Sequence, residues 1–419
     1  MFELFNRPSG VRENLMVKLV EHLEGKTRLI VPAVSLTTDP PPTSPVFFNP
    51  AASLNRDVSV ALTAATAGST FCDSMAGVGA RGLRVAREVG RIKRISFVDF
   101  NAAALRLARR AAALNGVERK CEFADSETSA FLFSRYGREE RFDYVDVDPF
   151  GTPIGQLQGA LSSTSDGGLL SVTATDTAVL CGVYPKVAKR RYGALPLNNQ
   201  FNHETAIRLL IGTAARIAAS LDLGVQPVAS HSTRHYVRIF LDVYAGASRA
   251  DSSLENLGYV TWCPACGHTE GNQDNRGKTC VQCGKKPKTA GPLWVGRLTD
   301  SQILQAAAGV AARKGLRPAN EILTALEGVD SFPPWSFSIE WICSRLKVAT
   351  VSESEVHREL RTSGFKAMRT PFERTGVKTD ADFAEVTKAV RGSRKAARPG
   401  SGSSHEVRSG QSFLRPSQK

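Results

Sequence analysis

The sequence predicts an open α/β sheet of mostly parallel strands, followed by a four-cysteine unit and a C-terminal α+β domain. Apolar segments typical of buried parallel strands alternate with helical patterns between about residues 69 and 244. Acidic residues end several of these strands, and a GxGxxG pattern of glycines follows the first. Two CxxC pairs stand close together beyond the sheet. These three observations define the fold class.

We divide the 419 residues into five segments. These are an N-terminal segment (1–68), the sheet domain (69–250), the four-cysteine unit (251–296), a C-terminal domain (297–390) and a basic tail (391–419) that we predict to be disordered. Apolar residues make up 42% of the chain, and the net charge of +14 favours a polyanionic partner such as nucleic acid. The tail either adds affinity for RNA or is merely solvated. Neither a signal peptide nor a membrane span is recognisable, so we expect a cytoplasmic protein.

The elements of the sheet domain follow in chain order. A strand entry at 24–32 and a rigid proline-rich loop at 39–45 precede it. The next elements are expected to be strands near 69–74, 94–99, 120–124, 142–147 and 168–174, with helices near 80–90, 101–115, 126–136 and 153–162. A long helix at 203–221, with Asn202 as N-cap, precedes an antiparallel hairpin of strands 225–231 and 235–244. Seven strands result, and ligands of such sheets bind beyond the carboxyl ends of the strands.

The glycine-rich loop after the first strand predicts a nucleotide-like ligand. Gly77, Gly79 and Gly82 form the GxGxxG pattern, which by itself also fits a dinucleotide-binding protein. Asp73 precedes them in the same loop, where its carboxylate would repel a pyrophosphate. It would instead face the ammonium group of S-adenosylmethionine (SAM).

Acidic residues at the next two strand ends complete the predicted SAM site. Asp99 is placed to hold the ribose hydroxyls, and Asp125 with Ser126 stands where the adenine amino group needs an acceptor. This order of acidic strand ends favours SAM over NAD, and with it a Rossmann-like, class I SAM-dependent methyltransferase sheet. An NAD-dependent oxidoreductase is the competing interpretation.

The predicted catalytic corner follows the fourth strand of the sheet. Asp148 can accept a hydrogen bond from an amino group on a flat ring, Pro149 fixes the turn, and Phe150 offers a face for stacking. An ordinary loop at a strand end is the alternative. The predicted SAM site earlier in the sequence favours the interpretation of this corner as the active site of an amino-methyltransferase.

The four-cysteine unit predicts a structural zinc site. Its ligands are Cys263, Cys266, Cys280 and Cys283, in the pattern CxxC-x13-CxxC, and a glycine follows each pair. Because four thiolates fill the coordination shell, the metal would not be catalytic. A disulfide pair is disfavoured in a reducing compartment, and His268 is a conceivable further ligand.

The C-terminal domain reads as helix, turn, helix and strand. The helices are expected at 338–346 and 352–364, and the strand at 365–370. Ser352 and Glu355 form a capping box, and Gly364 is the expected C-cap. This order is typical of a winged-helix-like module, which either binds nucleic acid or packs on its neighbours.

The motifs together resemble the tRNA guanine-26 N2-dimethyltransferases over about residues 25–390. The segments that carry the resemblance are FFNP (47–50), LNRD (54–57), GARGLR (79–84), VDPFG (147–151), VTATD (172–176), RYGALP (191–196) and GVKTD (376–380). The resemblance implies an enzyme that transfers one and then two methyl groups from SAM to N2 of a guanine in tRNA. It also implies SAM contacts at Arg56, Arg81, Asp99, Asp125 and Ser126.

The same resemblance implies roles for residues around the base. Asp148 matches the catalytic aspartate, and Phe48 and Phe150 match aromatic residues near the guanine. We expect the base to leave its stack and to lie on Phe150, with help from Phe47 or Phe48, while a small residue such as Thr152 faces N2. The partner is then tRNA, and no obligate protein partner is expected. An amino-methyltransferase of another RNA or DNA base, or a non-catalytic RNA-binding protein, are the alternatives.

Several charged residues keep two interpretations. Arg56 is either a cofactor contact or an ion-pair residue between domains, and Asp176 is either near the site or only a helix cap. The basic run at 186–191, which lies between Tyr184 and Tyr192, is either a phosphate-contacting face or a solvated helix. His203 and Glu204 are expected to be structural.

Overall fold

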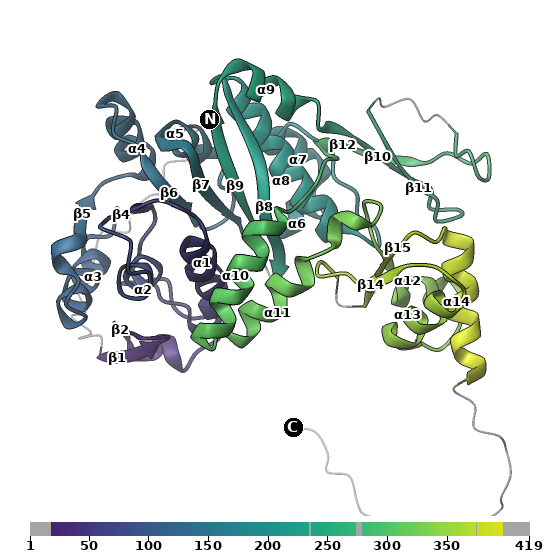
Figure 1. The fold of residues 1–419 in the computed structure, drawn as a ribbon, viewed down its shortest axis with the longest axis horizontal. Helices are drawn as coiled ribbons and strands as arrows, with labels where there is room; N and C mark the ends of the chain where they lie inside the picture. Colours follow the sequence, from purple (N-terminus) through teal and green to yellow (C-terminus); the bar gives the residue numbers. More distant parts are fainter. Residues whose placement is uncertain (1–17, 234–235, 274–278, 374, 397–419) are drawn as a thin grey trace, which may run out of the picture.

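The computed structural model describes residues 18–233, 236–273, 279–373 and 375–396. Most of the basic tail expected at 391–419 therefore lies outside the described residues. The molecule is elongated, with the large sheet at one end and a small C-terminal unit at the other (Figure 1). Among the described helices, none has the length and hydrophobicity that crossing a membrane requires.

A seven-stranded sheet organises the larger part of the chain. Its order is β5-β4-β3-β6-β7-β9-β8, in which β3 to β7 are parallel and β9 runs antiparallel to both of its neighbours. The strands are β3 (Thr70–Asp73), β4 (Arg94–Asp99), β5 (Cys121–Asp125), β6 (Phe142–Val147), β7 (Thr164–Ala174), β8 (Leu223–Thr233) and β9 (Tyr236–Ala245). The expected Rossmann-like sheet and its closing hairpin are confirmed.

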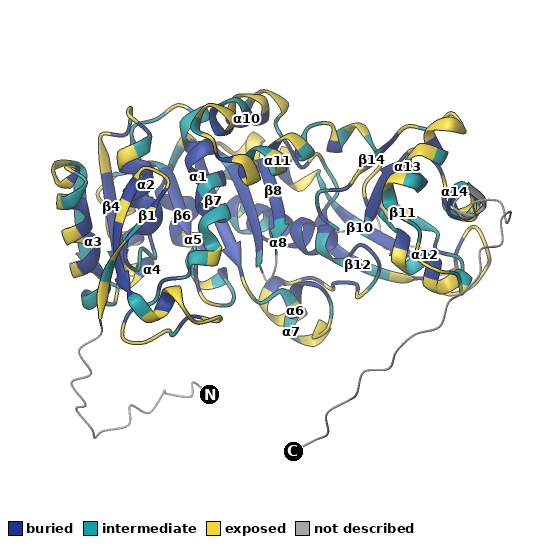
Figure 2. Cartoon of the chain, turned by 90° about the horizontal axis from the view of Figure 1, so that it is seen from below, coloured by how far each residue is buried: buried dark blue, intermediate teal, exposed yellow. Residues whose placement is uncertain are grey.

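Helices cover both faces of this sheet. The first face carries α1 (Ser53–Ala65), α2 (Ala80–Glu88) and α3 (Ala102–Leu114), with η3 (Glu118–Lys120) leading into β5. The second carries α4 (Thr128–Gly137), α5 (Ile154–Ser163) and α8 (Asn202–Ala219). Buried residues concentrate on the strands and on the inner faces of these helices (Figure 2). The expected N-cap of the long helix is wrong by one residue, because Asn202 is its first residue and Phe201 occupies the cap without a side-chain bond.

An N-terminal hairpin packs on the first face. It consists of β1 (Leu19–Glu24) and β2 (Thr27–Pro32), followed by η1 (Ala33–Leu36) and η2 (Pro50–Ala52). The sequence predicted β2 but missed β1, whose residues are mostly exposed or half-buried and carry a weak apolar signal. Glu24 is buried and forms ion pairs with Arg56 of α1 at 2.5 Å and Arg84 of α2 at 3.2 Å. The hairpin is thereby tied to the helices beside the glycine-rich loop.

Three short helices follow the later strands of the sheet and contact α8. They are α6 (Thr177–Leu180) and α7 (Pro185–Tyr192) after β7, and α9 (Ala247–Leu254) after β9. The four-cysteine unit follows as a sheet of its own, in the order β11-β10-β12. Its strands are β10 (Leu257–Trp262), β11 (Thr269–Asn272) and β12 (Lys288–Trp294), and β12 packs along α8.

Two helices that the sequence assigned to the C-terminal domain pack instead with the large sheet. These are α10 (Ser301–Lys314) and α11 (Arg317–Leu326), which contact α1 and β8 and are followed by η4 (Val329–Ser331). Leu304, Ala307 and Leu323 are fully buried in the same hydrophobic cluster as the sheet strands. The domain boundaries stay predictions, and we propose that the C-terminal unit begins near residue 337 rather than at 297 because a second cluster starts there.

The C-terminal unit has its own small core. Its elements are β13 (Phe337–Ser338), α12 (Ile339–Leu346), α13 (Glu353–Thr362), β14 (Ala367–Arg369), β15 (Gly376–Thr379) and α14 (Phe383–Ala396). The sheet order is β13-β15-β14, and the capping box of Ser352 and Glu355 is confirmed. The predicted C-cap is one residue off, since Ser363 is the cap and Gly364 follows with φ 88°. The expected order of helix, turn, helix and strand is present, and a winged-helix role stays a prediction.

Candidate active site

The acidic residues singled out from the sequence lie along one edge of the large sheet. Asp73, Asp99 and Asp125 end β3, β4 and β5, and Asp148 follows β6 directly. In the strand register Asp73 stands beside Asp146, and Asp99 beside Asp125. Because the carboxyl ends of neighbouring parallel strands share an edge, the topology brings these side chains together. This edge is where open α/β sheets bind their ligands.

The glycine-rich loop is held against this edge by backbone hydrogen bonds. Gly77 (φ 52°) donates its N–H to Asp99 Oδ2 at 2.7 Å, and Gly79 (φ 74°) is the N-cap of α2. The left-handed conformation favours glycine at both positions. A Cβ on Gly79 would also lie 2.9 Å from Ala108 Cβ, and one on Gly82 would lie 2.5 Å from the Phe97 ring. The loop can therefore bring its backbone close to a ligand.

Asp73 is a buried carboxyl group at the base of the loop. It accepts a hydrogen bond from the Gly82 N–H at 2.9 Å and is only 2% exposed. Burial, and then the negative charge of Asp146, raise its pKa to about 7 in spite of the nearby Arg81. A cationic ligand group would restore its charge. Asp73 therefore lies where the sequence expected it.

The predicted cofactor residues at the next two strand ends are more exposed. Asp99 also accepts the Asn101 N–H at 2.8 Å, Asp125 is exposed, and the Ser126 hydroxyl donates to the Glu127 carbonyl at 3.1 Å. Phe100, directly after Asp99, is 81% exposed and was missed by the sequence analysis. An apolar side chain so exposed beside the acidic edge offers a face to a flat ligand group. Its position after the acidic strand end was the available signal.

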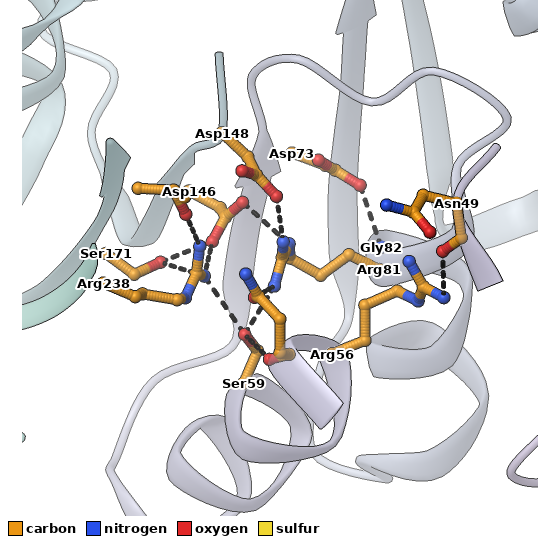
Figure 3. A network of polar contacts seen from close by, with 12 residues as sticks. Asn49, Arg56, Ser59, Asp73, Arg81, Gly82, Asp146, Asp148, Ser171 and Arg238 are labelled. Atoms are coloured by element: carbon orange, nitrogen blue, oxygen red, sulfur yellow. Dashed lines mark hydrogen bonds and ion pairs between the residues drawn. The ribbon is translucent and has the colours of Figure 1, made fainter. Parts of the chain in front are cut away.

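Two buried arginines hold the predicted catalytic corner (Figure 3). Arg81 of α2 donates to Asp148 and forms an ion pair with Asp146 at 2.8 Å. It also donates to Asn55 and to Ser59 of α1, each at 2.7 Å. The sequence placed Arg81 at the cofactor, and that contact stays a prediction. In the structure, Arg81 pairs with Asp146 and Asp148.

Arg238 of β9 was missed by the sequence analysis. It donates to Asp146 and to Ser171 at 3.1 Å, and also reaches Ser59 at 3.1 Å. Asp146 and Arg238 are 92 residues apart in sequence and both are buried, so no local pattern could have paired them. Arg81, Arg238 and Asp146 form a buried charge cluster beneath the partly exposed Asp148.

This cluster fixes the charge of Asp148. The Asp148 side chain is 30% exposed, whereas Asp146 beneath it is 1% exposed. Burial alone would raise the pKa of Asp148, but Arg81 and Arg238 together with a Thr173 hydrogen bond hold it below its usual value. Asp148 is therefore a carboxylate at neutral pH with one side open to solvent. Such a group can accept a hydrogen bond from an amino group.

The aromatic residues near this corner do not behave alike. Phe150 is 71% exposed, and its ring packs edge-to-face with Phe47, with the ring centroids 4.9 Å apart. Phe48 is only 2% exposed and lies under the Arg56 guanidinium, 5.2 Å from its centre. Stacking of a base on Phe48 would therefore require its neighbours to move. Of the two candidates from the sequence, the geometry favours Phe47.

Arg56 and Asp176 have clear structural partners. Arg56 pairs with Glu24 and donates to the Asn49 carbonyl at 3.1 Å, which anchors the segment that carries Phe47. The ion-pair interpretation of Arg56 thus has direct support, and its contact with a cofactor stays a prediction. Asp176 precedes α6 but makes no side-chain cap, and instead accepts the Tyr192 hydroxyl at 2.5 Å and pairs with Arg191 at 3.0 Å. Asp176 is thus the N-cap residue of α6, as one interpretation expected, but its side chain is used for these contacts and not for capping.

The four cysteines form a cluster some distance along the chain from the acidic edge. Their Sγ atoms all lie within 4.8 Å of one another, with Cys263–Cys283 and Cys266–Cys280 each at 3.5 Å. All four are free thiols, so the disulfide alternative is not realised. Each CxxC loop is closed by the same backbone bond, from Gly267 to Cys263 and from Gly284 to Cys280, at 2.8 Å. His268 lies outside the cluster.

Comparisons with known proteins find relatives along most of the chain. Residues 25–391 match the model of a family described as N2,N2-dimethylguanosine tRNA methyltransferase. A tRNA (guanine(26)-N(2))-dimethyltransferase of Methanosarcina mazei is 35% identical over 390 residues, covering 88% of this chain and 97% of that protein. One from Methanopyrus kandleri is 36% identical over 375 residues, covering 88% and 96%. The solved complex of Trm1 from Pyrococcus horikoshii with S-adenosyl-L-methionine superposes with a TM-score of 0.76, at 31% identity, over 88% of this chain and 99% of that one.

Proposed function

The chain belongs to the N2,N2-dimethylguanosine tRNA methyltransferase family, and on this premise we propose that it transfers one or two methyl groups from SAM to N2 of guanine 26 in tRNA. One observation carries the proposal. Asp148 is a charged, partly exposed carboxylate two residues before Phe150, whose exposed ring packs on the half-buried Phe47, at the edge of the sheet where the acidic residues of the proposed cofactor site lie. Family membership also decides for methyl transfer over hydride transfer.

Recognition of the base begins with its removal from the tRNA stack. Extrusion costs a few kcal/mol, and the enzyme must offset that cost by contacts with the flipped base. The exposed ring of Phe150, backed by the half-buried ring of Phe47, supplies an apolar platform for it, and Pro149 keeps the corner rigid. Asp148 then stands beside the platform, where it can accept a hydrogen bond from the exocyclic amino group.

The chemistry asked of Asp148 is orientation followed by proton acceptance. The N2 lone pair is delocalised into the ring, so N2 is a poor nucleophile until it is turned toward the methyl donor. SAM would supply an electrophilic methyl group on a sulfonium, and the neutral thioether that remains leaves without the help of an acid. Asp148 orients N2 through one of its hydrogens and takes the proton that N2 loses once the new carbon–nitrogen bond has formed. Arg81 and Arg238 keep the carboxylate charged between turnovers. The second methyl group needs space at N2, and Thr152 stays our candidate for the residue that leaves it.

Each proposed cofactor residue is assigned to a different chemical group of SAM. We assign Asp73 to the ammonium group, Asp99 to the ribose hydroxyls, and Asp125 and Ser126 to the adenine, with Phe100 added as an apolar contact. Gly77 and Gly79 let the backbone approach. Arg56 donates a hydrogen bond to the Asn49 carbonyl, and Arg81 donates one to Asp148. Both arginines thereby help to position the residues of this site.

A nucleoside mass-spectrometry assay tests the function as a whole. An unmodified tRNA transcript with guanine at position 26 is incubated with enzyme and SAM, and a transcript with adenine there is the matched control. We expect N2,N2-dimethylguanosine only in the first. Methylation of the control at the same level, or of neither transcript, would contradict the assignment of base and position.

Binding of SAM is expected to weaken as the pH falls below about 7. The pKa of Asp73 is raised to about 7, so at lower pH its carboxyl group must lose a proton before it can pair with an ammonium group. The affinity should then fall by up to about tenfold per pH unit. Calorimetric titration of SAM between about pH 5.5 and 8.5 measures this, and Asp73→Asn should bind weakly without the pH dependence. A pH-independent affinity of the unaltered enzyme would remove Asp73 from this role.

The four cysteines are proposed to hold a structural Zn²⁺ ion. Zinc–sulfur bonds of about 2.3 Å in a tetrahedron place sulfur atoms about 3.8 Å apart, close to the spacing of the four Sγ atoms here. The cluster also supports the C-terminal unit, since Arg345 of α12 donates to the carbonyls of Pro264 and Ala265 between the first two cysteines. The remaining buried free cysteines suit a reducing compartment, and we place the enzyme in the cytoplasm.

Removal of the metal is therefore expected to loosen the C-terminal unit while SAM binding persists. Chelation should release about one zinc ion per chain, measured with a colorimetric dye, and limited proteolysis should then cut the C-terminal unit faster. Cys280→Ser should reproduce this effect, and Cys121→Ser, outside the cluster, is the control. Unchanged proteolysis after complete metal release would show that the cluster does not position this unit.

A further inference from the structure

The helix α7 carries three exposed cationic side chains that have no ion-pair partner among the described residues. Lys186, Lys189 and Arg190 are exposed, and none of them forms an ion pair with any residue that the structure describes. The eight-residue helix contains no acidic residue, and its fourth cation, Arg191, is neutralised by Asp176. A face of uncompensated positive charge is therefore built into this helix.

These three side chains share one side of α7. Residues three and four apart are neighbours on a helix, so Lys186 lies beside both Lys189 and Arg190. Ala188 and Tyr192, which are fully buried, mark the opposite side that packs on the protein. In Figure 2, α6 and α7 project from the body of the molecule with exposed residues on their outer surface. The charged side thus faces solvent.

Hydrogen bonds fix α7 relative to the catalytic corner. Gly151 N–H donates to Thr175 Oγ1 at 2.6 Å, and Thr175 N–H donates back to the Gly151 carbonyl at 2.9 Å. The next residue, Asp176, accepts the Tyr192 hydroxyl at the end of α7. A short path of hydrogen bonds therefore connects the loop of Phe150 with the last turn of α7. A ligand on α7 would keep a constant position relative to Phe150.

We propose that Lys186, Lys189 and Arg190 bind backbone phosphates of the tRNA next to the flipped guanine. The proposal rests on the function proposed above. Ammonium and guanidinium groups suit phosphate oxygens by charge and hydrogen bonding. While the base lies on Phe150, its own flanking phosphates must pass close to that residue, and α7 is the basic element tied to the same loop. These contacts hold the strand while the base is out of the stack.

The salt dependence of tRNA binding tests this surface. The triple variant Lys186→Gln, Lys189→Gln, Arg190→Gln is compared with the full-length unaltered enzyme, using an unmodified tRNA transcript at several salt concentrations. We expect the Kd to rise about 10–100-fold near 0.1 M salt, and the slope of log affinity against log salt to fall by about 2–3. The affinity for SAM should not change, which also reports that the variant is folded.

A matched triple variant controls for net charge. Lys93→Gln, Arg94→Gln and Arg119→Gln remove three exposed cations at the amino ends of β4 and β5, on the opposite edge of the sheet. It should bind tRNA as the unaltered enzyme does, because long-range charge effects are screened at this salt concentration. An unchanged Kd and slope in the α7 variant, or an equal loss in the control, would overturn the proposal.

The two proposals fail in different ways. If the unaltered enzyme methylates guanine 26 and the α7 variant keeps its tRNA affinity, the assigned function stands and this surface is refuted. If the unaltered enzyme binds tRNA without methylating it, the function is refuted, while the change in salt slope still decides the role of α7.

Discussion

Replacing Asp148 with asparagine is expected to slow methyl transfer to tRNA by about 10²–10⁴-fold, with SAM binding retained. Asparagine keeps the shape of the side chain but cannot take up the proton that N2 loses. It also gives up the charge that the two arginines maintain at this position. Single-turnover measurements with saturating SAM and tRNA isolate the chemical step, and calorimetry with SAM alone shows that the cofactor site is intact.

The same substitution elsewhere provides the control for Asp148. Asp222 is exposed at the amino end of β8 and has a positive φ of 54°, which asparagine tolerates well. Asp222→Asn should therefore leave both the rate and the fold unchanged. A near-normal rate for Asp148→Asn would mean that orientation of N2 comes from other groups, and the catalytic assignment would have to be withdrawn.

Acid titration should leave the role of Asp148 untouched over a wide range. Because its folded pKa lies below the usual carboxylate value, Asp148 stays charged at mildly acidic pH. A loss of activity with an apparent pKa near 7 would then come from Asp73 and be visible in SAM binding. The two carboxylates can thus be separated by comparing the pH dependence of the affinity with that of the rate at saturating SAM.

The second large effect is expected on stability, from Glu204→Ala. Glu204 is fully buried in α8, where it accepts hydrogen bonds from Arg208 at 2.9 Å, Lys378 of β15 at 3.2 Å and the Trp335 N–H at 3.0 Å. Without it, two buried cations lose the one carboxylate with which they form ion pairs among the described residues. The free energy of unfolding should fall by about 3–5 kcal/mol, measured by urea unfolding.

A double variant controls for the buried charge. Adding Lys378→Met to Glu204→Ala removes one stranded cation, so the pair should lose less stability than the sum of the two single variants. Additive losses would show that the two residues do not interact. The expected structural role of Glu204, inferred from the sequence, is met by these contacts, which join α8 to the C-terminal unit.

The pH dependence of this contribution has a definite sign. Burial alone would raise the pKa of Glu204, but Lys378 and Arg208 hold it below the ordinary value of 4.5. Because the pKa of Glu204 is lower in the folded than in the unfolded state, its stabilising contribution is fully present above the unfolded-state pKa. The contribution is lost as the pH falls through the folded-state pKa. The difference between the enzyme and the variant should therefore narrow only in acid, well below pH 5.

Much of the site was determined by local sequence. Strand periodicity located β3 to β7, the spacing of the glycines located the loop, and Asp73, Asp99, Asp125 and Asp148 follow from where their strands end. Parallel neighbours bring such ends together without further information. The CxxC spacing likewise implied the four-cysteine cluster, since each pair closes its own loop. These features follow from local patterns, since each strand end, glycine turn or CxxC pair is recognisable by itself and the parallel order of the strands brings the ends together.

Other features were decided only by the tertiary structure. Arg238 reaches Asp146 because β9 lies between β7 and β8, and Lys378 reaches Glu204 across 174 residues. Of the adjacent Phe47 and Phe48, packing against Arg56 buries one and leaves the other beside Phe150. The sequence carries no local mark of these pairings, because a charge or ring shows no preference for its partner until the crossing of strands and helices brings the two into contact and excludes water. The sequence by itself thus determined the acidic strand ends, the glycine-rich loop and the cysteine cluster, and the fold decided which residues support them.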